Sequence, residues 1–134
     1  MIILDGKTAA ASVKEKLKHE VDALLDAGKR APHLAAILVG NNGASETYVA
    51  SKAKNCEDVG FQSTLIRLDA AITENELLQK IQELNNNEQI DGILVQLPLP
   101  KHISEAKVIE TIAPEKDVDG FHPISAGKLV QGLP

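Results

Sequence analysis

The fold is decided by residues 40–60, GNNGASETYVASKAKNCEDVG, which follow the apolar run LAAILV at residues 34–39. A short apolar run that ends in a Gly/Asn turn is typical of a strand buried in a parallel sheet. After the turn, apolar side chains recur at spacings of four, three and three residues, at Val49, Ala53, Cys56 and Val59. This period predicts a helix that packs on the sheet and begins near Ser45, whose hydroxyl can cap the first turn.

The same helix has a second row of side chains, which is polar and consists of Ser45, Tyr48, Lys52 and Asn55. Tyr48 and Lys52 are four residues apart, so they share one helical face. In open α/β sheets, ligands bind where helices follow the carboxyl ends of strands. A tyrosine there can stack on a flat ring, and a lysine one turn later can exchange a proton with the same ligand. On residue types alone, the pair also fits a solvated helix face.

The rest of the chain alternates helices with short strands. The patterns predict helices over 6–27, from the capping box Thr73-x-x-Glu76, over 104–112 and in the tail after residue 121, and strands over 63–68 and 92–96. Gly28 fits a left-handed C-cap of the first helix, which we expect to pack on the sheet. This alternation predicts an open, mostly parallel α/β sheet in three layers, with helices on both faces.

Composition restricts the class of protein. The chain has 134 residues, 43% of them hydrophobic and 25% charged, which is ordinary for one globular domain. No apolar run approaches the roughly 20 residues of a membrane span, and no signal peptide is visible, so we expect a cytoplasmic protein. A net charge of −5 argues against nucleic acid as a partner. The single Cys56 is interpreted as a core residue, and the four histidines, expected in loops or at the surface, show no metal-ligand spacing, so no metal site is predicted.

Two further blocks carry polar residues that belong at the same edge of the sheet. Residues 92–100 read GILVQLPLP, with Gln96 at the carboxyl end of a predicted strand, and residues 114–123 read PEKDVDGFHP, with Asp119 before a glycine. We expect Gln96 and Asp119 to converge on Tyr48 and Lys52 from separate connections. Read singly, Gln96 could cap backbone groups and Asp119 could form a turn.

Taken together, the three blocks resemble the bifunctional methylenetetrahydrofolate dehydrogenase/cyclohydrolase family, in the same order and at about the same spacing. The resemblance covers essentially all 134 residues but only about the first half of a family member. It implies an amino-acid-dehydrogenase-like N-terminal domain, with a tetrahydrofolate-binding catalytic domain over residues 1–120 and the start of a linker over 121–134. The Rossmann nucleotide-binding domain of the family, with its glycine-rich loop, is not found in this sequence.

The resemblance also implies an activity in one-carbon metabolism, which serves purine biosynthesis. The family oxidises 5,10-methylenetetrahydrofolate with NADP or NAD and hydrolyses the 5,10-methenyl product to 10-formyltetrahydrofolate. The implied roles are proton transfer for Lys52, positioning of that lysine for Gln96, stacking for Tyr48, pterin binding for Asp119, lining of the cleft for Val95, Leu97 and Pro98, and either ligand contact or capping for Ser45. Ser125 departs from the asparagine that many members carry, so the role of this position stays open.

For the chain on its own, we expect no bound NADP or NAD, no dehydrogenase activity and weak folate binding; the full-length protein is expected to be a homodimer. We also expect partial desolvation and a cationic substrate to disfavour the ammonium form of Lys52. Two other readings remain: a folate-binding or interaction module without catalysis, and a substrate domain like those of amino-acid or shikimate dehydrogenases.

Overall fold

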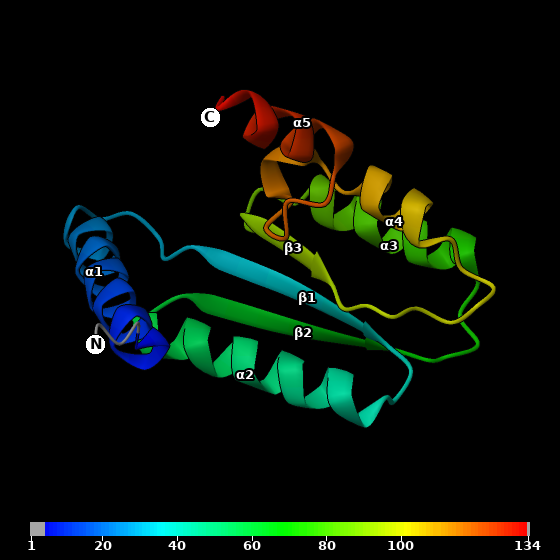
Figure 1. Cartoon of the computed structure of the whole chain (residues 1–134), viewed down its shortest axis with the longest axis horizontal. Helices are drawn as coiled ribbons and strands as arrows, with labels where there is room; N and C mark the ends of the chain where they lie inside the picture. Colours follow the sequence, from blue (N-terminus) through cyan, green and yellow to red (C-terminus); the bar gives the residue numbers. More distant parts are fainter. Residues whose placement is uncertain (1–4, 134) are drawn as a thin grey trace.

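The structure is a computed structural model that describes residues 5–133, and it has the predicted α/β architecture (Figure 1). The elements are α1 (Gly6–Asp26), β1 (His33–Val39), α2 (Gly43–Val59), β2 (Gln62–Leu68), α3 (Glu74–Asn85), β3 (Gly92–Val95), α4 (Glu105–Thr111), the 3-10 turn η1 (Pro114–Lys116) and α5 (Pro123–Gln131). The three strands are parallel and lie in the order β2-β1-β3. No helix among the described residues is both long and apolar enough to cross a bilayer.

Helices cover both faces of the sheet, as the sequence predicts, with α2 on one side and α3 and α4 on the other (Figure 1). The central strand β1 is buried from Ala35 to Val39. Its odd-numbered residues join a core with the inward faces of α3, β3 and α4, whose fully buried members are Leu77, Ile81, Ile93 and Val108. This packing holds the carboxyl end of β3, and the residues that follow it, at a fixed place beside β1.

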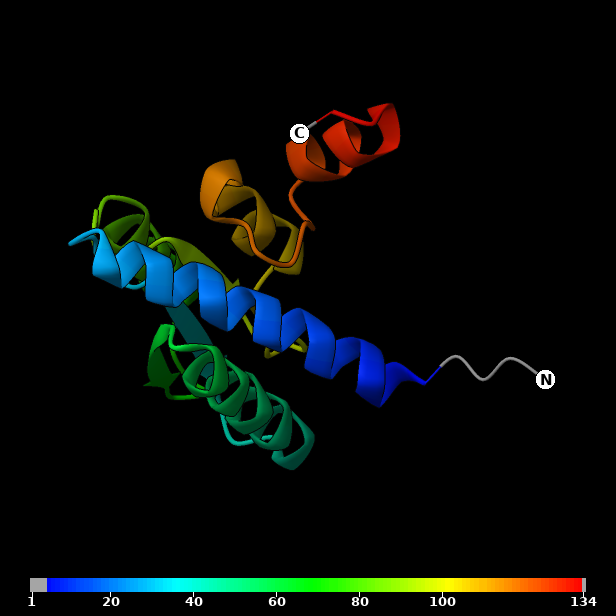
Figure 2. The same ribbon diagram turned by 90° about the vertical axis from the view of Figure 1, so that its left-hand side faces the viewer.

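Several local predictions are confirmed. The hydroxyl of Thr73 accepts the backbone N–H of Glu76 at 3.3 Å, and the Glu76 carboxylate accepts the backbone N–H of Thr73 at 2.9 Å. Ser104 caps α4, and Gly28 adopts a left-handed φ of 71° just after α1. The tail after Phe121 forms the helix α5, which extends away from the sheet (Figures 1 and 2).

Two predictions, about the cap of α2 and the packing of α1, are wrong. α2 begins at Gly43, two residues before Ser45, but its cap is Asn42 and not Ser45, because the Asn42 side chain accepts the backbone N–H of Ser45 at 3.2 Å. α1 packs against α2 and not on the sheet (Figure 2). Val21 is the one buried residue of α1, and Val13 on the same helix is 58% exposed. α1 therefore has more apolar side chains on its periodic face than its contact with α2 buries.

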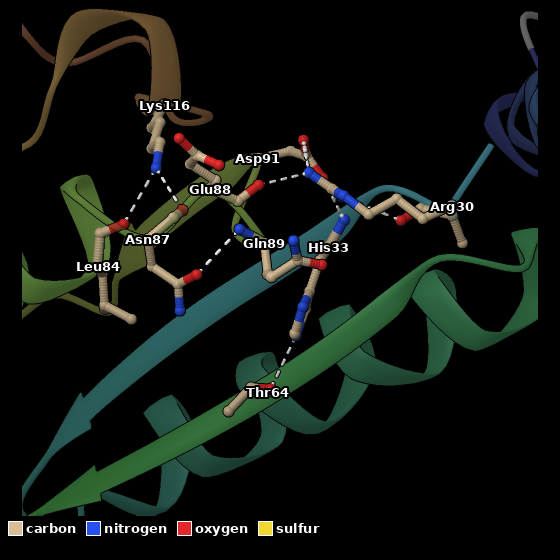
Figure 3. A network of polar contacts seen from close by, with 10 residues as sticks. Arg30, His33, Thr64, Leu84, Asn87, Glu88, Gln89, Asp91 and Lys116 are labelled. Atoms are coloured by element: carbon tan, nitrogen blue, oxygen red, sulfur yellow. Dashed lines mark hydrogen bonds and ion pairs between the residues drawn. The ribbon is translucent and has the colours of Figure 1, made fainter.

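A polar network ties together the amino-terminal ends of the strands (Figure 3). The Arg30 guanidinium donates to both carboxylate oxygens of Asp91, at 2.5 and 2.8 Å. The same carboxylate accepts the backbone N–H of His33 at 2.8 Å, and the His33 ring lies 2.8 Å from the Thr64 hydroxyl. His33 is the first residue of β1, whereas the sequence placed it in the loop before the strand. The network joins the segments that enter β1 and β3, at the end of the sheet opposite the predicted site.

This network predicts a loss of stability in acid. The hydrogen bond from Arg30 lowers the pKa of the Asp91 carboxyl, while desolvation opposes the shift. A carboxyl whose pKa is lower in the folded than in the unfolded protein stabilises the fold above its unfolded pKa of about 3.9, and this contribution is lost as pH falls through the folded value. We therefore expect Asp91→Asn to lower the thermal unfolding midpoint near neutrality. The difference from the unsubstituted chain should shrink as pH falls below about 4. Circular dichroism melts across pH would show it, and a difference independent of pH would contradict it.

Candidate functional site

The contact between Lys52 and Asp119 is the centre of the candidate site. Lys52 lies on α2 and Asp119 lies in the loop between η1 and α5, yet the Lys52 Nζ is 3.8 Å from the Asp119 Oδ1. The two side chains are 36% and 32% exposed. The structure therefore brings two of the predicted site residues together from opposite halves of the sequence.

The packing of α2 explains why Lys52 and Tyr48 are accessible. Val49 and Cys56 are buried against the sheet, 1% and 8% exposed, and they fix the rotation of the helix. Lys52 and Tyr48 then lie on the flank of α2 that this packing leaves uncovered. Tyr48 is 64% exposed, so its ring is free to stack on another flat group. Burial raises the pKa of the Cys56 thiol, which agrees with its interpretation as a core residue.

Gln96 follows the last residue of β3 and extends the pairing with β1 by one step, since its backbone N–H donates to the Ile37 carbonyl at 2.9 Å. Its side-chain amide donates to the Leu97 carbonyl at 2.8 Å, which is the backbone-capping role that the sequence left open. The side-chain carbonyl Oε1 is buried and accepts no hydrogen bond from any residue that the structure describes. The predicted bond between Gln96 and Lys52 is thus not made here, and an acceptor remains available. A buried acceptor without a donor costs free energy, so a group that satisfies it would be favoured.

The remaining predicted site residues are those expected to line the cleft, and they differ in where they lie. Val95 and Leu97 line a hollow together with Asp119 and Phe121, but its volume is only about 10 Å³. Pockets that hold small molecules typically measure roughly 300–1,000 Å³, so this hollow is too small to hold a ligand as it stands. Pro98 is exposed and is joined to Leu97 by a cis peptide bond.

Two further side chains near the site are Ser45, whose role the sequence left open, and Phe121, which the sequence did not identify. Ser45 is 3% exposed in the first turn of α2, which fits a structural role. Phe121 is 58% exposed and lines the hollow with Asp119, although the sequence did not identify it as a site residue. The signal that could have found it is its position two residues after Asp119 in a chain that has only three aromatic residues.

A larger hollow lies elsewhere, between α1 and α2. It measures about 460 Å³ and is lined mainly by apolar side chains, among them Val13, Leu17, Cys56 and Phe61. None of the predicted site residues borders it. Its size reflects the loose contact of α1 with α2, so it adds nothing to the candidate site.

Comparison with known proteins identifies the family. The profile of the tetrahydrofolate dehydrogenase/cyclohydrolase family, catalytic domain, matches residues 4–119. The chain belongs to this family. The match spans α1 to Asp119 and so includes Tyr48, Lys52 and Gln96.

Individual relatives agree with this assignment. The bifunctional protein FolD of Bacteroides thetaiotaomicron is 58% identical over 134 residues, which is all of this chain and 46% of the relative. The crystal structure of the bifunctional enzyme FolD, methylenetetrahydrofolate dehydrogenase/cyclohydrolase, from Campylobacter jejuni superposes with a TM-score of 0.95 at 51% identity, and covers 99% of this chain and 47% of that one. The FolD of Trypanosoma brucei, complexed with NADP cofactor and inhibitor, gives a TM-score of 0.90 at 35% identity, with 96% and 43% covered. The chain thus spans less than half the length of these relatives.

Proposed function

We propose that this chain is the folate-binding and catalytic part of an enzyme of one-carbon metabolism. That enzyme oxidises 5,10-methylenetetrahydrofolate to 5,10-methenyltetrahydrofolate and hydrolyses the product to 10-formyltetrahydrofolate. The observation that carries the proposal is the contact between Lys52 and Asp119 at 3.8 Å, which unites a proton-transfer group and a pterin-binding group on one accessible surface. The names of the relatives from Campylobacter jejuni and Trypanosoma brucei, which combine dehydrogenase and cyclohydrolase, support the same assignment.

The hydrolytic step requires two proton movements, which one amine can serve. Water attacks the cationic methenyl carbon and loses a proton; the bond from that carbon to N5 then breaks, and the formyl group remains on N10. One proton of the water ends on N5 and the other leaves to solvent. In its neutral form, Lys52 accepts the first proton from the attacking water and then delivers a proton to N5. The positive charge of the substrate is proposed to disfavour the ammonium form of Lys52 and so to supply the neutral amine.

The other side chains orient the substrate. The pterin edge presents adjacent N–H groups, and the Asp119 carboxylate can accept two of them in parallel. When it does so it withdraws from Lys52, whose amine can then donate to the unsatisfied Oε1 of Gln96. The exposed ring of Tyr48 stacks on the substrate, with Val95, Leu97 and Pro98 on the other side. Ser45 supports the first turn of α2 beneath this surface.

Hydride transfer requires a nicotinamide nucleotide as acceptor. We assign NADP or NAD to this role, bound by a part of the enzyme that lies outside the length spanned by this chain. The sequence contains no glycine-rich phosphate loop of the Rossmann type. The full-length enzyme is proposed to act as a homodimer in the cytoplasm.

A second candidate is a module that binds folate without turning it over. It is favoured by the contact of Lys52 with Asp119 in place of Gln96, whose side-chain Oε1 accepts no hydrogen bond from the described residues. The two candidates differ in whether hydrolysis accompanies binding.

Folate binding tests the role of Asp119 directly. We expect Asp119→Ala to weaken the binding of 5-formyltetrahydrofolate to the 134-residue chain by about 10- to 100-fold, since charge-assisted hydrogen bonds contribute roughly 1.5–3 kcal/mol. Isothermal titration calorimetry measures the affinity. Glu115→Ala, which removes an exposed carboxylate from the same segment, should bind like the unsubstituted chain. Equal affinities for Asp119→Ala and Glu115→Ala would exclude the proposed role.

A further inference from the structure

The sequence Asp117-Val118-Asp119-Gly120 contains two aspartates, and they make different contacts. Asp117 accepts two backbone hydrogen bonds, from the N–H of Gly120 at 3.1 Å and from the N–H of His122 at 2.9 Å. Asp119 takes no part in these bonds, and among the described residues its charged partner is Lys52. One carboxylate therefore holds the loop, while the other is presented to the site.

The two hydrogen bonds of Asp117 fix the backbone of the loop that carries Asp119. The first closes a turn from residue 117 to residue 120, so Asp119 lies inside that turn. Gly120 has a φ of 69°, a conformation that glycine adopts without strain and that lets the chain reverse immediately after Asp119. The second bond fixes the backbone of His122, which is the N-cap of α5. The carboxylate of Asp117 thus sets the path of the chain on the carboxyl side of Asp119.

The amino side of the loop is anchored independently. The Lys116 Nζ donates to three carbonyls at the end of α3 and just beyond it, those of Leu84, Asn85 and Asn87, at 3.1, 2.7 and 2.9 Å (Figure 3 shows the bonds to Leu84 and Asn87). The backbone of Asp117 pairs in parallel with Ile93, the second residue of β3. Asp119, two residues after this bridge, lines the same hollow as Val95.

We propose that Asp117 is a positioning residue for substrate binding, whose carboxylate folds the loop so that Asp119 faces Lys52. This inference rests on the proposed function, in which Asp119 holds the pterin. Without the carboxylate at position 117, two backbone N–H groups lose their acceptor and the turn loses its closure. Asp119 would then spend only part of its time in the position that the substrate requires, and the observed affinity would fall by that fraction.

The test compares three variants of the 134-residue chain in binding 5-formyltetrahydrofolate. Asp117→Ala is expected to weaken binding by about tenfold, because it removes both hydrogen bonds. Asp117→Asn keeps one acceptor of the right length and is expected to recover part of the affinity. Asp91→Ala is the control, because the Asp91 carboxylate also accepts a backbone N–H and forms an ion pair, but at the opposite end of the sheet. This variant should leave the affinity unchanged once the affinity is corrected for any unfolded fraction. The amide NMR signals of Gly120 and His122 report the loop directly and should move in Asp117→Ala before any ligand is added.

The outcomes separate this inference from the proposed function. If Asp119→Ala binds weakly while Asp117→Ala binds like the unsubstituted chain, the inference is wrong and the proposed function stands. If Asp119→Ala has no effect, or if the unsubstituted chain shows no binding at millimolar ligand, the proposed role of Asp119 fails and the inference fails with it. If Asp91→Ala weakens binding as much as Asp117→Ala, or if Asp117→Asn recovers nothing, the effect is general destabilisation and the positioning role is rejected.

Discussion

Replacing Lys52 with methionine should lower the rate of 5,10-methenyltetrahydrofolate hydrolysis by about 10²- to 10⁴-fold, the usual contribution of a positioned acid or base. Methionine keeps much of the length of the lysine stem but cannot carry a proton. The measurement uses a chimera in which this chain is followed by the remainder of the Bacteroides thetaiotaomicron relative, because the chain spans only 46% of that relative. Disappearance of the methenyl compound, followed by its absorbance, gives the rate.

Lys54→Met is the matched control for this experiment. Lys54 lies on the same helix two residues further on, is exposed, and pairs with Asp58 at 3.5 Å, away from the candidate site. It should leave hydrolysis within about twofold of the unsubstituted chimera, because exposed ion pairs contribute little. A Lys52→Met chimera that folds, as judged by circular dichroism, and still hydrolyses within a few-fold of the parent would refute the proton-transfer role.

The strands and helices were predictable where one periodic pattern dominated. The buried strand after residue 33, the capping box at Thr73 and the left-handed Gly28 all follow from local chemistry, and all are confirmed. The capping residue of α2 was not predictable, because Asn42 and Ser45 both carry side chains that can cap a helix. The packing of α1 was also not predictable, since an apolar helical period shows that a face is suited to burial but does not show which partner buries it.

The candidate site was likewise predictable from the sequence only in part. Tyr48 and Lys52 follow from helical spacing and the resemblance, and their exposed flank of α2 is a consequence of how Val49 packs. Asp117 was not identified, because a carboxylate that bonds to backbone N–H groups leaves no spacing pattern. The sequence offered turn formation as an alternative role for Asp119, and the structure gives that role to its neighbour Asp117. Local composition predicted a turn at residues 117–120 correctly, but it does not show which of the two aspartates forms that turn.

Gly92→Ala is expected to destabilise the fold by roughly 1–3 kcal/mol, although it adds only one methyl group. Gly92 opens β3 and is buried, and a Cβ at this position would clash with Cγ1 of Val118 and come within 3.5 Å of Leu34. Val118 lies between the two aspartates of the loop, so its displacement moves the residue that carries the site. The variant should therefore also lose affinity for 5-formyltetrahydrofolate, whereas a substitution that only weakened the core would lower stability alone. Chemical denaturation measures the first effect and calorimetry the second.

A double-mutant cycle that combines Gly92→Ala with Val118→Ala tests whether Val118 transmits the effect of the first substitution to the loop. Val118→Ala removes the atom that clashes, so Gly92→Ala/Val118→Ala should regain most of the lost stability and affinity. Gly127→Ala is the matched control, because a Cβ there meets nothing within 4 Å and the residue lies inside α5. It should be neutral or slightly stabilising, since alanine favours a helix over glycine by up to about 1 kcal/mol. If the double variant is as unstable as Gly92→Ala alone, the strain falls on the strand itself and not on the loop. The glycine at the start of β3 would then matter for the pairing of the sheet and not for the position of Asp119.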